Sequence, residues 1–223
     1  MLFSLVVLMS TALCIFIVEG WRKMIHEKIK NFNVESSRLT CADFIKRLLE
    51  KKGLNYTVRH DIDAPTGHCH YRKKEIVLSY PPESIKYLAL YQAGHEAGHA
   101  FYGPGLLKKN VFLSFPVVLA SFALPFYAGW KGWSETAALR TLLLIYAVIV
   151  ALCMSNIISE VRASLFSINK IEQAISDARL RKLKLFVIQE IASDVLVITG
   201  LYVIWASAIW IFYKMAVYLS LNT

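Results

Sequence analysis

The sequence has few cysteines and no regular arrangement of them. The four cysteines include no CxxC pair, and two of them, Cys14 and Cys153, lie in apolar stretches where a free thiol behaves as a small hydrophobic side chain. This spacing argues against a disulfide framework and against a zinc site built on Cys41 or Cys69. The sequence also lacks internal repeats and low-complexity tracts, which excludes a repeat architecture.

Acidic residues are also few. Only 16 of them stand against 25 lysines and arginines, which gives a formal net charge of +9. A basic excess is common in nucleic-acid-binding proteins, but here the basic residues flank long apolar runs and form no separate basic domain, so no nucleic-acid partner is predicted. The hydrophobic fraction of 56% and the mean hydropathy of +0.46 exceed those of a typical soluble globule and predict a membrane protein.

Four apolar stretches approach the ~20 residues that a helix needs to cross the hydrocarbon core of a bilayer. They cover residues 2–18, 111–130, 139–158 and 195–213. The first has no basic stretch before it and ends without a small-residue cleavage site, which favours a retained membrane anchor over a cleaved signal peptide. We therefore expect a mainly α membrane protein with about four transmembrane helices and a small cytoplasmic α+β portion.

The distribution of lysine and arginine predicts the orientation in the membrane. Sixteen of them lie in residues 19–110 and six in residues 159–194, whereas Lys131, Arg140 and Lys214 make up the remainder. By the positive-inside rule both basic segments face the cytoplasm, so an integral protein of the plasma (inner) membrane is expected. The predicted segments are an anchor (1–18), a cytoplasmic α+β segment (19–110), two spans (111–158), a cytoplasmic helical segment (159–194) and a last span with its tail (195–223).

The longer cytoplasmic segment shows helix and strand signals. Thr40 and Asp43 have the spacing of an N-cap and an acidic N3 residue, and Gly53 is a suitable helix stop. Between them, four apolar positions keep one helical face: Phe44, Ile45, Leu48 and Leu49. Residues 56–60 and 75–79 are typical of short strands separated by a turn-rich loop, and a helix of about five turns follows Pro82 and ends at Gly103.

This last helix carries the motif HExxH, formed by His95, Glu96 and His99. Residues four positions apart lie on one face of a helix, so both imidazoles can bind one metal ion. Glu96 lies beside them and can take a proton from water without being a ligand. The small residues around the histidines and the Gly-Pro stop favour a catalytic zinc site over a pair of surface histidines.

A catalytic zinc ion normally has three protein ligands, and the motif supplies two. Gly105 stands where the longer motif HExxHxxGxxH has its third histidine, so the third ligand must come from farther along the chain. Glu160, at the cytoplasmic end of the third apolar stretch, is the best candidate. Glu190 and Asp194, at the start of the last stretch, remain alternatives.

The chain resembles the YugP-type neutral zinc metallopeptidases of membranes, which are similar to gluzincins. The resemblance covers about residues 37–199 and depends on four blocks in a fixed order, namely Leu39-Thr40-Cys41-Ala42, Ile76-Val77-Leu78-Ser79, His95-Glu96-Ala97-Gly98-His99-Ala100 and Glu160-Val161-Arg162-Ala163-Ser164. It implies zinc-dependent endopeptidase activity on a protein or peptide substrate, with His95, His99 and Glu160 as zinc ligands. It also implies that the strand before the active-site helix is an edge strand that pairs with extended substrate.

The sequence departs from the family pattern in two places. Arg162 replaces an aspartate of the last block, which removes an acidic side chain near the third ligand, and an extra basic linker follows the first apolar stretch. Arg162 could contact substrate carbonyls, and Tyr102 could stabilise an oxyanion, although packing at a helix end explains Tyr102 more simply. His68 and His70 alternate on one face of a strand without a third partner, which favours a structural role.

Three functions remain open from the sequence. Zinc would lower the pKa of water and polarise a peptide carbonyl while Glu96 acts as general base, as in a peptidase. An intramembrane protease also uses HExxH, but the polar Lys86 and Gln92 and the nearby lysines favour a helix at the membrane boundary. The third is a non-catalytic metal-binding scaffold or sensor that retains the zincin fold. The sequence carries no signal of oligomeric state.

Overall fold

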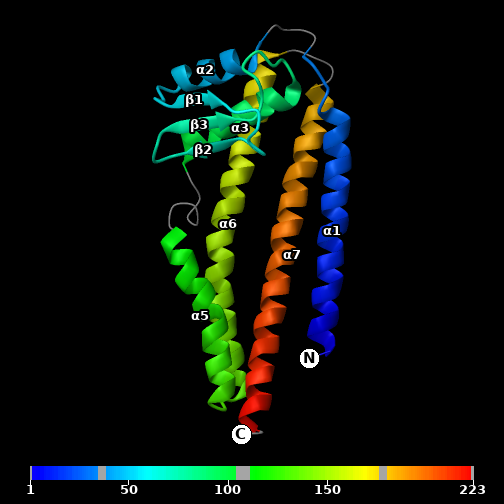
Figure 1. Ribbon diagram of the computed structural model, residues 1–223, viewed down its shortest axis with the longest axis vertical. Helices are drawn as coiled ribbons and strands as arrows, with labels where there is room; N and C mark the ends of the chain where they lie inside the picture. Colours follow the sequence, from blue (N-terminus) through cyan, green and yellow to red (C-terminus); the bar gives the residue numbers. More distant parts are fainter. Residues whose placement is uncertain (1, 35–38, 104–110, 176–179, 222–223) are drawn as a thin grey trace. The chain divides into compact units, whose positions relative to one another are not determined.

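The computed structural model describes residues 2–34, 39–103, 111–175 and 180–221, and it confirms a mainly α-helical protein with one small sheet (Figure 1). The helices are α1 (Leu2–Ile29), α2 (Cys41–Lys51), α3 (Tyr87–Tyr102), α5 (Val111–Trp130), α6 (Glu135–Ala174) and α7 (Leu180–Leu221). The strands are β1 (Thr57–His60), β2 (His68–His70) and β3 (Glu75–Leu78).

The chain divides into two compact units, each built from segments that are distant in the sequence. Unit 1 comprises Met1–Gly20, Leu106–Asn156 and Ser193–Thr223, and unit 2 comprises Trp21–Gly105 and Ile157–Ala192. Unit 1 contains almost all of the apolar stretches. Unit 2 contains the sheet, α2, α3 and the HExxH motif.

All four apolar stretches are helical. Residues 111–130 form the whole of α5, and the others lie within α1, α6 and α7. Within the described part of the chain one helix, α7, is long and apolar enough to cross a membrane by its length and composition. The structure therefore supports a mainly α protein with one such helix, which is fewer than the four spans expected from the sequence.

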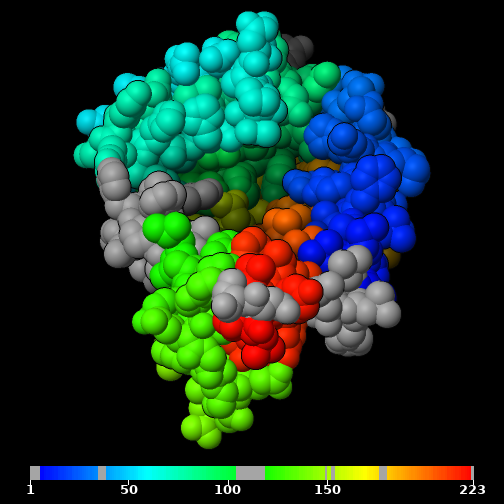
Figure 2. All heavy atoms as spheres, turned by 60° about the horizontal axis from the view of Figure 1, so that its bottom comes forward, coloured from blue at the N-terminus to red at the C-terminus, as the bar shows by residue number. Residues whose placement is uncertain are grey.

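Inside unit 1, the end of α5 packs closely against the C-terminal part of α7, as Figure 2 shows in green and red. Ala128, Ala138 and Tyr213 form a small buried cluster there. A Cβ atom added to Gly129 would lie 2.6 Å from the backbone oxygen of Tyr213 and 2.9 Å from the Cβ of Ala216. Only glycine permits this approach, because any larger residue would push the two helices apart.

In unit 2, α2 forms as the sequence predicts. The Thr40 hydroxyl oxygen accepts a hydrogen bond from the backbone N–H of Asp43 at 3.1 Å, which satisfies one of the free donors at the helix start. Gly53 follows the helix with a φ of 63°, a conformation that glycine adopts without strain. The four apolar positions of the predicted face, Phe44, Ile45, Leu48 and Leu49, are all buried.

The sheet has the order β1-β3-β2, so β3 is the central strand. It pairs in parallel with β1 and antiparallel with β2, and its residues Ile76, Val77 and Leu78 are fully buried. The expectation that residues 75–79 form an edge strand for substrate is therefore wrong, because both hydrogen-bonding edges of β3 are already paired. The sequence placed His68 and His70 on a strand, but it did not show that this strand, β2, pairs with β3.

Candidate metal centre

Helices α3 and α6 approach closely because small residues face each other where they meet. A Cβ atom added to Gly98 would lie 2.9 Å from the Cα atom of Ala163, and one added to Gly94 would lie 3.0 Å from the Cα atom of Ser167. The Ser167 hydroxyl also donates a hydrogen bond to the backbone oxygen of Tyr91 at 2.8 Å. The two backbones are thus held together on both turns that carry the HExxH histidines.

This close approach brings Glu160 of α6 to the two histidines of α3. The Nε2 atom of His95 lies 3.0 Å from the Nε2 atom of His99, and one carboxylate oxygen of Glu160 lies 3.2 Å and 3.1 Å from these two nitrogens. In the described part of the chain these three residues form the group of histidine, cysteine and carboxylate side chains that could hold a metal ion. The sequence-based candidates His95, His99 and Glu160 are therefore brought together.

The donor set fits a zinc ion. Bonds of about 2.0–2.1 Å from a tetrahedral zinc ion separate neighbouring ligand atoms by about 3.3 Å, close to the three separations of the cluster. Two imidazole nitrogens and one carboxylate oxygen also make the ligand chemistry of catalytic zinc sites, which leave a fourth position open. The exposed fractions of the side chains are 5% for His99, 18% for His95 and 31% for Glu160, so the cluster is accessible from the side of Glu160.

A second layer of polar contacts fixes the His95 ring. Its Nδ1 atom lies 3.2 Å from the hydroxyl of Ser164, which in turn lies 2.9 Å from the hydroxyl of Tyr91. When Nδ1–H donates to the Ser164 oxygen, this contact orients the imidazole and leaves Nε2 free to bind a metal.

Glu96, the sequence-based candidate for a general base, follows His95 directly on α3. It is buried, with 6% of its surface exposed. Its carboxylate is therefore largely shielded from bulk water.

Tyr71 interacts electrostatically with the site, which the sequence did not indicate. Burial raises the pKa of its hydroxyl, and electrostatic interactions with Cys69, Glu96 and Glu160 raise it further. A tyrosine hydroxyl is protonated at neutral pH and can donate a hydrogen bond. The only signal in the sequence was its place directly after His70, and a lone tyrosine after a short strand has no distinctive pattern.

The two other carboxylate candidates, Glu190 and Asp194, do not belong to the group around the histidines among the described residues. Glu190 forms an ion pair with Arg22 at 2.9 Å. Glu160 is therefore the carboxylate candidate that the structure brings to the histidines.

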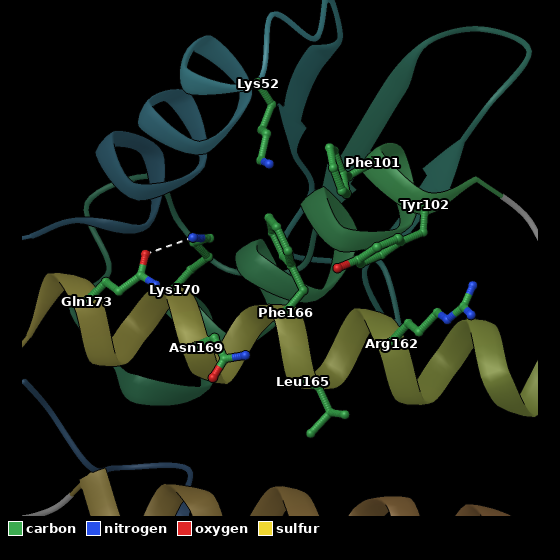
Figure 3. A pocket seen from close by; sticks show the side chains of 9 residues that line it. All are labelled: Lys52, Phe101, Tyr102, Arg162, Leu165, Phe166, Asn169, Lys170 and Gln173. Atoms are coloured by element: carbon green, nitrogen blue, oxygen red, sulfur yellow. Dashed lines mark hydrogen bonds between the residues drawn. The ribbon is translucent and has the colours of Figure 1, made fainter.

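The remaining candidates are Tyr102, Arg162, His68 and His70. Tyr102 and Arg162 line a pocket whose described lining includes none of the three cluster residues (Figure 3). His68 and His70 lie on β2 with their ring centroids 4.5 Å apart, and neither belongs to the candidate metal group among the described residues.

Comparison of the chain with protein-family models, with curated proteins and with solved structures finds no match.

Proposed function

We propose that this protein is a membrane-bound zinc endopeptidase. One observation carries the proposal: His95, His99 and Glu160 bring three donor atoms to one point, with the buried carboxylate of Glu96 beside them. An HExxH motif alone requires only one helix. A third donor from α6 at 3.1–3.2 Å is the additional feature that distinguishes a zincin-like site from an accidental motif.

In the proposed reaction, His95, His99 and Glu160 hold the zinc ion. When bound, zinc supplies Lewis acidity that makes water more acidic and polarises the scissile carbonyl. Glu96 takes the proton of the attacking water and passes it to the leaving amine. The protonated hydroxyl of Tyr71 donates a hydrogen bond to the carbonyl oxygen as negative charge develops there. Ser164 keeps the His95 ring in place throughout.

In this proposal the peptide substrate pairs with β2, because β3 is already paired on both sides. β2 is an edge strand, and it precedes Tyr71 directly. Gly67, at its start, lies against Gln92 of α3, whose side chain also accepts a hydrogen bond from the backbone N–H of Ser79 at 2.9 Å. An extended peptide added to the outer edge of β2 would continue the sheet beside the active-site helix.

We further propose that α1, α5, α6 and α7 all cross the inner membrane, with the metal site facing the cytoplasm. The lysine and arginine distribution supports the orientation. Large apolar side chains of the proposed spans are exposed, including Phe16 (76%), Leu144 (71%) and Leu196 (58%), which suits contact with lipid. Glu160 follows the apolar stretch that ends at Ile158, so soluble or juxtamembrane segments are the expected substrates.

The test is to measure zinc per chain and casein cleavage in detergent for the wild type, Glu96→Gln and Glu160→Ala. The wild type should bind about one zinc ion and cut casein, Glu96→Gln should keep the zinc without cutting, and Glu160→Ala should lose the zinc. Glu190→Ala is the matched control, because it removes the other candidate carboxylate and should keep the zinc.

Two outcomes contradict the proposal. Absence of zinc from the wild type would remove the metal site altogether. Zinc binding without any cleavage by the wild type, or cleavage unchanged in Glu96→Gln, would favour the non-catalytic scaffold or sensor that retains the same fold.

A further inference from the structure

A pocket of unit 2 lies beside the C-terminal ends of α2 and α3, and its described lining includes none of the metal-cluster residues (Figure 3). Its volume is about 410 Å³. The described lining consists of Lys52, Phe101, Tyr102, Arg162, Leu165, Phe166, Asn169, Lys170 and Gln173. The proposed peptidase reaction uses none of these residues.

Three aromatic rings form the centre of this pocket. Phe101 and Phe166 stack with centroids 5.8 Å apart, and Tyr102 meets both rings edge to face. Phe166 is buried, whereas Phe101 and Tyr102 expose 40% and 47% of their surfaces, and Leu165 exposes 49%. The pocket therefore presents apolar surface that the described parts of the chain leave open.

Three cations line the pocket, and none of its described lining residues is acidic. The ammonium of Lys52 lies 4.1 Å from the centroid of Phe101, and that of Lys170 lies 5.8 Å from the centroid of Phe166. Lys170 donates one hydrogen bond to the side chain of Gln173 at 2.7 Å, and an ammonium carries three donors. Together with Arg162, these groups favour an anionic ligand that also has an apolar part.

The place of the pocket along α6 indicates where such a ligand is found. Arg162 follows Ile158, the last residue of the apolar stretch, by four positions, or about 6 Å of helix. The headgroup region of a bilayer extends about 5–8 Å beyond the hydrocarbon core on each side. If residues 139–158 span the membrane, Arg162 and Leu165 lie at headgroup level. Aromatic and basic side chains are the groups that membrane proteins place at this level.

We propose that this pocket binds the headgroup of an anionic phospholipid of the surrounding bilayer. Lys52 and Lys170 pair with the phosphate, Arg162 adds positive charge at the other end of the pocket, and the exposed faces of Phe101 and Tyr102 contact the glycerol and upper acyl chains (Figure 3). The proposal rests on the membrane placement of α6 put forward above, and it does not depend on zinc or on peptide cleavage. An acidic peptide shares the charge but does not explain the apolar rim beside the end of a span.

The experiment titrates the detergent-purified chain with phosphatidylglycerol or phosphatidylcholine and counts bound lipids by native mass spectrometry. It uses the Glu96→Gln background, so that self-cleavage does not interfere. Each of Lys52→Gln, Arg162→Gln and Lys170→Gln should weaken phosphatidylglycerol binding about fivefold, and the triple variant about a hundredfold. The matched control combines Lys46→Gln, Lys51→Gln and Lys73→Gln, which remove the same charge outside the pocket and should change binding less than about twofold.

Three results would overturn the proposal. Equal binding of phosphatidylglycerol and phosphatidylcholine would exclude headgroup recognition. If the control variant lost as much phosphatidylglycerol binding as the triple pocket variant, the loss would be due to net charge and not to the pocket. Binding of a glutamate-rich peptide that depends on the three pocket cations, without phosphatidylglycerol binding, would make the pocket a peptide site. If the triple variant unfolds, phosphatidylglycerol binding by the single variant Arg162→Gln is the deciding measurement, because this side chain is exposed and its replacement should not disturb the fold.

A parallel carbonate extraction of cell membranes separates these failures from those of the proposed function. A chain released by carbonate is not integral, and the lipid proposal then fails together with the membrane placement. A chain that stays in the membrane but shows no lipid preference contradicts the pocket alone. The zinc and casein measurements are independent of both results.

Discussion

Among the single residues, Tyr71 has the clearest chemical consequence. Its hydroxyl interacts electrostatically with Glu96 and Glu160, and in the proposed reaction it stabilises the developing oxyanion. We expect Tyr71→Phe to lower kcat for casein about a hundredfold with zinc per chain unchanged, since loss of one oxyanion donor has effects of this size. Steady-state kinetics and metal analysis on the same sample provide the measurement.

Tyr102→Phe is the matched control for this prediction, because the same hydroxyl is removed from a side chain that lines the separate pocket. It should leave kcat within about twofold of the wild type. If Tyr102→Phe has the larger effect, the oxyanion role belongs to Tyr102 and the role assigned to Tyr71 is wrong.

Cys41 gives a second residue-level prediction. Burial raises the pKa of its thiol to about 12, and its sulfur donates a hydrogen bond to the backbone oxygen of Ala89. Because the thiolate is the reactive form, Cys41 should resist iodoacetamide at pH 9 in the folded chain and react once urea unfolds it. Mass-spectrometric mapping of the labelled cysteines is the measurement, with the partly exposed Cys69 as internal reference.

The same shift predicts a pH dependence of stability. The pKa of Cys41 is higher in the folded than in the unfolded chain, so its contribution is complete below about pH 8.5 and is lost as the pH rises toward 12. Cys41→Ala should reduce this alkaline loss. Equal labelling of Cys41 and Cys69 in the folded chain would contradict the burial on which both expectations depend.

For the elements, the meeting of α3 and α6 decides whether the metal ligands converge. A methyl group on Gly98 would lie 2.9 Å from the Cα and 3.1 Å from the backbone oxygen of Ala163. Unlike the end of a flexible side chain, these backbone atoms cannot rotate out of the way. We expect Gly98→Ala to destabilise the fold by about 1–3 kcal/mol and to weaken zinc binding, because α6 must move away. Thermal unfolding and zinc titration in detergent measure both effects.

Gly20→Ala is the control for this prediction. Gly20 also lies within a helix, but an added Cβ would meet nothing within 4 Å. The substitution should be neutral or stabilising by up to about 1 kcal/mol, since alanine favours the helix. A Gly98→Ala protein as stable as Gly20→Ala would show that the two helices do not need glycine to meet.

For the whole molecule, the proposed topology predicts which segments face the cytoplasm. In a variant without native cysteines, Lys131→Cys, between α5 and α6, should react with a membrane-impermeant maleimide in intact cells. Lys73→Cys, between β2 and β3, should react only after the inner membrane is permeabilised. Labelling of Lys73→Cys in intact cells would reverse the orientation and place the metal site outside the cytoplasm.

The sequence by itself determined the local features of this protein. Thr40, Asp43 and Gly53 define α2, because capping and glycine conformations depend on neighbouring backbone atoms. His95 and His99 lie together because four residues make about one helical turn. The helical state of the apolar stretches followed from their length and composition, whereas the number that span a membrane remains part of the proposal.

Only the tertiary structure decided the features that depend on distant segments. It brought Glu160, and not Glu190, to the two histidines, because Gly94 and Gly98 let α6 approach α3 while Arg22 pairs with Glu190. It also made β3 the central strand and placed Tyr102 and Arg162 in one pocket. Strand order and helix crossings are set by packing between residues far apart in the chain, so they cannot be predicted from local sequence patterns.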